Sequence, residues 1–176
     1  MRTIALSTVL TVCLATSLAA GDITATGGWT EVIDASDLVS GAGSDLQSVY
    51  ESATDATVLD VTPAFDFYDV YVRRSDTNWS GDFSLYIKRA GDGTGGGSIS
   101  FGATYKEVTT VDTKFFSGYM SRTGIPIQYK LSGMSVNIAP DTYSTTVIFT
   151  IVDSAPYPPS GVGAKKLQIP PFWGRS

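Results

Sequence analysis

The sequence has no histidine, and its only cysteine is Cys13. The absence of histidine excludes Ser-His-Asp and Cys-His triads and histidine-ligated metal sites, which are the commonest routes to enzymatic hydrolysis. Cys13 lies in an N-terminal segment that we expect to be removed, so the remaining chain has no thiol for catalysis, structural zinc or a disulfide. We therefore predict a non-enzymatic protein with no catalytic residues, no metal and no cofactor.

Charged residues are also scarce, at 16% of a 176-residue chain that is 43% hydrophobic. Only three of the 17 acidic residues are glutamate, and aspartate favours turns and strand ends over helix interiors. Together with plentiful Gly, Ser, Thr and Tyr, this composition is typical of strands and turns, and the length suits one domain. The net charge of −5 repels a phosphate backbone, so we predict no nucleic-acid partner.

The N-terminal segment has the features of a secretory signal peptide. Arg2 supplies a positive charge, an apolar run of about 15 residues begins at Ile4, and small residues precede a cleavage point after Ala19. A spanning helix needs about 20 apolar residues, and serines and threonines interrupt this run. We predict that residues 1–19 are removed during export, that no membrane span remains, and that the mature protein is secreted to the periplasm or the cell surface.

Alternating apolar residues predict strands along most of the mature chain. In residues 66–74, for example, positions 68, 70 and 72 share one face and positions 69, 71 and 73 share the other. No segment has a convincing amphipathic helical pattern. We predict an all-β fold, an antiparallel β-sandwich of about 7–9 strands over residues 20–153. The expected strands are 29–33, 57–61, 66–74, 83–88, 115–116, 125–131, 134–138 and 143–152, and residues 98–101 and 103–108 form either one bulged strand or two short ones.

The remaining segments are expected to be irregular. Residues 21–28 are small and polar and should lie loosely against the body, while 34–52 should form a long loop with at most one helical turn. Residues 75–81 and 89–98 read as connections between strands. The last segment, 154–176, is a proline-rich tail with three positive charges and no acid, and its prolines prevent it from continuing a sheet.

Two kinds of site that act on carbohydrates are compatible with the sequence, one catalytic and one for binding. Paired carboxylates can cleave glycosidic bonds, but a solvated strand face or a turn explains the acids near the predicted strands more simply; these are Asp60, Asp66, Asp69 and Glu107. Exposed aromatic side chains could stack on sugar rings, or could equally cover the faces of a sandwich. The candidates for a carbohydrate-binding role are Tyr71, Trp79, Tyr86 and Tyr105.

The final strands carry a resemblance to a known group of proteins. Residues 125–131, the Ser132-Gly133 pair, the Pro140-Asp141-Thr142-Tyr143 turn and the Thr/Val/Ile strand up to Val152 resemble the closing strands of exported pilin-like subunits. These are the spore coat protein U and chaperone-usher type domains, which often have a Pro-Gly-x-Tyr turn before an alternating strand. Asp141 stands here in place of the glycine, and the paired cysteines common in those subunits are missing.

This resemblance implies an immunoglobulin-like subunit that completes its sheet with a strand from a neighbour, either a second copy of this chain or another exported subunit, which is β-augmentation. One candidate donor is the stretch 23–33, with Trp29 and Ile33 as contacts. The other is the tail, which the acidic body would attract; its candidate contacts are Leu167, Ile169, Phe172 and Trp173. We predict a structural or surface-assembly subunit, with a secreted carbohydrate-binding module as the alternative.

Overall fold

The protein was analysed as a computed structural model, which describes residues 2–8, 21–62, 64 and 66–154. This part of the chain forms strands and one short 3₁₀ turn, η1 (Ala35–Asp37). Eight strands have six or more residues: β1 (Arg2–Thr8), β2 (Asp22–Ile33), β4 (Thr57–Thr62), β5 (Phe67–Asn78), β6 (Ser84–Arg89), β10 (Thr113–Tyr119), β11 (Arg122–Ser132) and β12 (Thr142–Asp153). The short strands are β3 (Val49–Glu51), β7 (Thr94–Gly95), β8 (Ile99–Ser100) and β9 (Lys106–Glu107).

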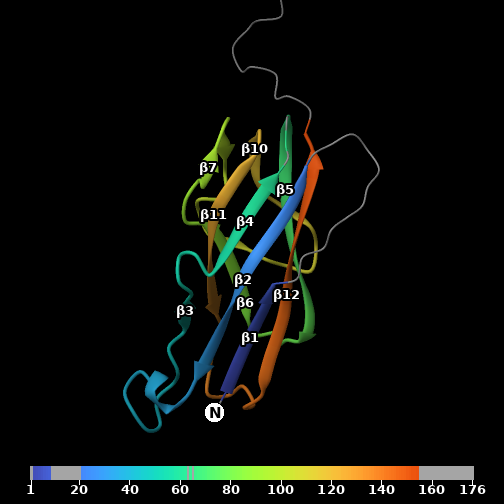
Figure 1. The fold of residues 1–176 in the computed structure, drawn as a ribbon. Coiled ribbons are helices and arrows are strands. Elements are labelled where there is room, and N and C mark those ends of the chain that lie inside the picture. Colours follow the sequence, from blue (N-terminus) through green and yellow to red (C-terminus); the bar gives the residue numbers. More distant parts are fainter. Residues whose placement is uncertain (1, 9–20, 63, 65, 155–176) are drawn as a thin grey trace, which may run out of the picture.

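These strands form two packed sheets, and the predicted all-β sandwich is confirmed (Figure 1). The first sheet has the order β8-β10-β5-β12-β1-β2. The second has the order β2-β4-β11-β6-β9, with β3 and β7 also paired to β11. All pairs are antiparallel except β1 with β12.

The core lies between the two sheets and follows the two-residue period of the sequence. On β5, Tyr68, Val70 and Val72 are fully buried, while Asp69 and Tyr71 lie on the outer face. These side chains pack against apolar residues of β4, β6 and β11 from the second sheet. Since each fully buried apolar side chain contributes about 1.5–3 kcal/mol, this layer supplies the main stabilisation of a domain that has few charges.

Strand β2 belongs to both sheets, and this is where one sequence prediction was wrong. Residues 21–28 were expected to lie loosely, but Asp22–Gly27 pair with β4, and Gly28–Ile33 pair with β1. Gly27 lies at the change of partner with a φ of +108°. A side chain on Gly27 would overlap the Ala56 carbonyl oxygen, and that oxygen accepts a hydrogen bond from the Gly28 N–H (2.8 Å). A positive φ at so close an approach requires glycine.

Two other segments also differ from the prediction. Strand β5 continues through residues 75–78, because these polar residues pair with β12 along their backbone. Residues 134–138 do not form a strand, although their apolar residues alternate. The Asp45 carboxylate accepts a hydrogen bond from the Val136 N–H (2.9 Å), and Ile138 N–H bonds to the Ser135 carbonyl (3.2 Å), so the segment turns. The predicted irregular segment 34–52 contains only η1 and β3.

Candidate functional site

Strand β1 lies inside the first sheet and not at its edge, although it comes from the segment with signal-peptide features. It lies between β12 and β2, and Figure 1 shows it flanked by these two strands. Thr3–Thr8 pair with residues 142–147 of β12 in parallel, and Arg2–Ser7 pair with residues 28–33 of β2 in antiparallel. The sequence signal for a strand here is the alternation of Ile4 and Leu6 with smaller residues, which a signal-peptide pattern obscures.

The space that β1 fills is a groove between β2 and β12, which we call the β1 groove. Its walls are six residues of β2 (28–33) and six of β12 (142–147). No other described strand pairs with β2 over residues 28–33. Without β1, the backbone N–H and C=O groups that face it on both walls would lose their partners, and unpaired buried backbone groups are strongly disfavoured.

The β12 wall of the groove is mostly apolar on its inner side. Tyr143, Thr145 and Val147 are buried. The Thr145 hydroxyl donates to the Asp76 carboxylate (2.7 Å), so the hydroxyl of the one polar residue in this row has its hydrogen-bond partner on β5. The Tyr143 hydroxyl donates to the Ala139 carbonyl (2.8 Å), which ties the wall to the preceding turn. A strand entering this groove therefore lies beside a row of buried side chains whose two hydroxyl groups already have partners.

Trp29 and Ile33, two of the predicted assembly contacts, lie on the β2 wall of the β1 groove. Ile33 is buried in a second core cluster, and Trp29 packs against both clusters. The Trp29 indole N–H donates to the Glu31 carboxylate (3.1 Å). Both residues belong to a strand of their own sheet. They are therefore better placed to contact a strand donated by a neighbour than to be part of a donated strand. The other predicted contacts, in the tail, lie outside the described residues.

The aromatic residues predicted for sugar binding do not form one platform. Tyr71 is on β5 in the first sheet, whereas Tyr86 is on β6 in the second. Trp79 packs edge-to-face on Phe83 at 5.4 Å and under the Arg74 guanidinium at 5.1 Å, and it contacts both core clusters. Tyr71 alone keeps an outward position on the first sheet, beside Lys114 of β10.

Tyr86 belongs instead to an ordered layer on the second sheet. The Lys130 ammonium lies 4.6 Å from the Tyr86 ring and 4.4 Å from the Tyr105 ring, a cation–π arrangement. The Lys88 ammonium lies 4.5 Å from the Tyr105 ring. Burial, together with the nearby Glu51 carboxylate, raises the pKa of Tyr105 to about 12. The layer stabilises the sheet surface and leaves the Tyr86 ring covered by a lysine.

Sequence reasoning missed two residues that shape the surface of the first sheet. Phe101 is exposed between β8 and β9, and Arg89 at the end of β6 is buried and donates to the Phe101 carbonyl (2.8 Å from Nε). The only local signal was the Phe101-Gly102 pair, at the break between the expected strand segments 98–101 and 103–108. A buried arginine reaching across to a loop is a tertiary contact that no local pattern predicts.

A comparison of the chain with protein-family models and with curated proteins finds no match. Within residues 2–8, 21–62, 64 and 66–154, no helix has the length and apolar character to cross a membrane. The same residues contain no group of three or more histidine, cysteine, aspartate and glutamate side chains arranged to hold a metal ion. The β1 groove is taken as the candidate site because backbone pairing defines both of its walls.

Proposed function

We propose that this protein is an exported structural subunit of a surface assembly, and that the β1 groove receives a strand from a neighbouring subunit. One observation carries the proposal: the strand between β2 and β12 comes from the very segment that has signal-peptide features. If export removes residues 1–19, the mature domain lacks this strand. The subunit then needs a replacement strand to satisfy both walls.

A replacement strand restores the backbone hydrogen bonds that the two walls lose when β1 is cleaved off. Backbone hydrogen bonds give affinity in strand addition, and pockets for alternate side chains give specificity. Six residues on each wall offer two ladders at once, whereas an ordinary sheet edge offers one. An open groove of this kind is also an aggregation hazard, so a dedicated partner strand benefits the free subunit as well as the assembly.

The tail, residues 154–176, is the donor that the chemistry favours. Leu167 and Ile169 alternate before Pro170, and Phe172 and Trp173 add large apolar anchors. The tail carries three positive charges and no acid, while the whole chain has a net charge of −5. Trp29 and Ile33 then act as acceptor contacts on the β2 wall.

The first experiment determines the N-terminus and the oligomeric state of the exported protein. Intact mass and N-terminal sequencing should show a chain that begins at Ala20, because the small residues before it suit signal peptidase. Light scattering after size exclusion should give oligomers or fibres for this chain and a smaller species for a version that ends at Ser154. An exported protein that retains residues 2–8, or one that is monomeric with its tail intact, would contradict the proposal.

Cysteine trapping tests the donor and the groove directly. Loss of Cys13 with the leader makes the mature chain free of cysteine, so Thr30→Cys on the exposed side of the β2 wall and Gln168→Cys in the tail introduce the only thiols. Mixing the two variants under oxidation should give a disulfide-linked dimer. Val111→Cys, exposed and outside the groove, is the control for random collision. Equal trapping at Val111 and Thr30 would exclude a specific tail–groove contact.

A competing peptide gives an independent check. The heptapeptide RTIALST has the sequence of β1 and should occupy the β1 groove of the mature domain. Because it fills both walls without linking subunits, it should slow assembly and raise the melting temperature of the version that ends at Ser154. A scrambled peptide of the same composition is the matched control, and equal effects of the two peptides would count against the groove.

A further inference from the structure

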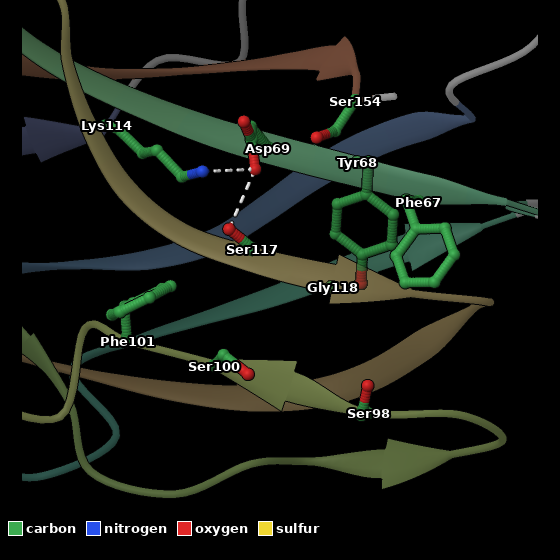
Figure 2. A pocket seen from close by; sticks show the side chains of 10 residues that line it. All are labelled: Phe67, Tyr68, Asp69, Ser98, Ser100, Phe101, Lys114, Ser117, Gly118 and Ser154. Atoms are coloured by element: carbon green, nitrogen blue, oxygen red, sulfur yellow. Dashed lines mark hydrogen bonds and ion pairs between the residues drawn. The ribbon is translucent and has the colours of Figure 1, made fainter. Parts of the chain in front are cut away.

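The outer face of the first sheet has a second feature, a cleft beside Phe101 that the proposed assembly does not use. The cleft has a volume of about 300 Å³ and lies over β8, β10 and β5 (Figure 2). It is near the end of β12, away from residues 142–147 that line the β1 groove. The side chains that matter for its chemistry are Asp69, Ser98, Ser100, Phe101, Lys114 and Ser117. We call it the Phe101 cleft.

The backbone conformation of Phe101 at the cleft is energetically unfavourable. Its side chain is 69% exposed and its φ is +67°, a backbone conformation that bulky residues rarely adopt. Arg89, only 6% exposed, fixes this conformation by donating from Nε to the Phe101 carbonyl (2.8 Å) and from Nη2 to the same oxygen. Strain that the surrounding structure imposes on an exposed aromatic residue points to a role in binding.

Polar groups lie across the cleft from the phenyl ring. Figure 2 shows the Lys114 ammonium and the Ser117 hydroxyl converging on Asp69, at 2.8 Å and 2.7 Å from the same carboxylate oxygen. Ser98 and Ser100 line the β8 side, and their hydroxyls make no hydrogen bond to any residue that the structure describes. The cleft thus combines one apolar ring with several donors and acceptors in fixed positions.

The cleft continues into a second hollow. This hollow, of about 720 Å³, shares Phe101 and Lys114 with the first and also has Tyr105 and Phe115 in its lining. Tyr71, which pairs with Lys114 across β5 and β10, adds an aromatic side chain on the same outer face. Two adjoining hollows around one exposed ring suit a ligand that is a chain of several rings.

We propose that the Phe101 cleft binds a neutral oligosaccharide. A pyranose ring has an apolar C–H face that can pack on the Phe101 ring, and its edge hydroxyls can bond to the Asp69 carboxylate, the Lys114 ammonium and the serines. The Asp69–Lys114 pair has no net charge, and the chain is acidic, so an anionic glycan would gain little. Strand addition of a peptide is disfavoured, since β8 offers an edge of only two residues.

The test uses the full chain and defined neutral probes. Di- to tetrasaccharides of hexoses and N-acetylhexosamines are screened on an array, and the best probe is titrated by NMR at millimolar concentration. Phe101→Ala and Asp69→Asn should each weaken binding at least about tenfold, the loss expected when a central contact is removed. Val111→Ala, which truncates another exposed apolar residue outside the cleft, should bind as the parent does.

The outcomes separate clearly. The melting temperature of each variant confirms that it is folded, and Phe101 and Asp69 are outside the core clusters. Loss of binding in both cleft variants with retention in Val111→Ala supports the proposal. It is overturned if no neutral probe binds, if only anionic glycans bind, or if either cleft variant binds like the parent. None of these results depends on assembly through the β1 groove.

Discussion

Replacing the buried Arg89 by methionine should destabilise the protein far more than removing its acidic partner. Arg89 donates to the carbonyls of Phe101 and Gly91, at 2.8 Å from Nε and 3.1 Å from Nη1, and pairs with Asp92. Its guanidinium also lies 5.7 Å from the Phe116 ring. Methionine keeps the apolar packing on Phe116 but leaves two part-buried carbonyls without these donors. It also removes the charge that pairs with Asp92, and the Asp92 variant measures that contribution separately.

The size of the loss follows from these contacts. A hydrogen bond to a charged group contributes about 1.5–3 kcal/mol, so loss of the donors to Phe101 and Gly91 costs about 4 kcal/mol. Release of the positive φ at Phe101 returns about 1–2 kcal/mol. We therefore expect Arg89→Met to lower the free energy of unfolding by about 2–3 kcal/mol. Asp92 is 65% exposed, so Asp92→Asn should cost less than about 1 kcal/mol.

Urea unfolding followed by tryptophan fluorescence measures both values. The midpoint should fall for Arg89→Met with an unchanged m-value, which shows that the folded state is still compact. Asp92→Asn is the matched control, since it disrupts the ion pair while the hydrogen bonds to the carbonyls remain. If Arg89→Met unfolds like the parent, or if Asp92→Asn costs as much, the buried arginine does not clamp the Phe101 loop.

Three further predictions concern tyrosines and one glycine. The buried Tyr68 hydroxyl has no hydrogen-bond partner among the described residues, so Tyr68→Phe should raise the free energy of unfolding by up to about 1 kcal/mol. Tyr129→Phe should lower it by about 1 kcal/mol, because the Tyr129 hydroxyl bonds to Thr57 (2.8 Å). Urea unfolding of the two variants measures both changes, and equal effects would contradict this prediction. A Cβ at Gly118 would overlap the Tyr68 ring, so Gly118→Ala should cost about 1–3 kcal/mol, and an unchanged melting temperature would show that the ring can move. The pKa of Tyr105 is raised to about 12 from 10.0, so this residue contributes to the free energy of unfolding fully below pH 10, and the contribution is lost as the pH rises towards 12. Tyr105→Phe should reduce this loss of stability between pH 10 and 12, and a pH profile identical to that of the parent would contradict the assignment.

Much of the fold was predictable because alternation is a local property. The faces of β5 and the apolar positions of β11 and β12 follow from a period of two, and they pack as expected. The residues that the structure describes contain no α-helix, which agrees with the scarcity of glutamate and other helix formers. The loop nature of most of residues 34–52 also follows from composition. In all these cases, neighbouring residues in the sequence are enough to determine which side chains can be buried.

The assignments that failed depended on partners far away in the chain. Residues 22–27 are too small and polar to predict a strand, and they form one because β4 supplies the backbone pairs. Residues 134–138 alternate like a strand but turn because Asp45 binds the Val136 N–H. A local pattern carries no information about such contacts.

Both candidate sites likewise arise from long-range contacts. Pairing of β1 with β12 brings residues at opposite ends of the chain together and defines the β1 groove. Arg89, on another strand, holds the backbone carbonyl of Phe101, whose exposed side chain lines the cleft. Composition and periodicity determined that this chain forms a β-sandwich, because burial of alternate side chains is decided within each strand. Which strand fills the sheet and which aromatic ring faces solvent were decided only when distant segments met, since backbone pairing and buried polar contacts depend on the partner rather than on neighbours in sequence.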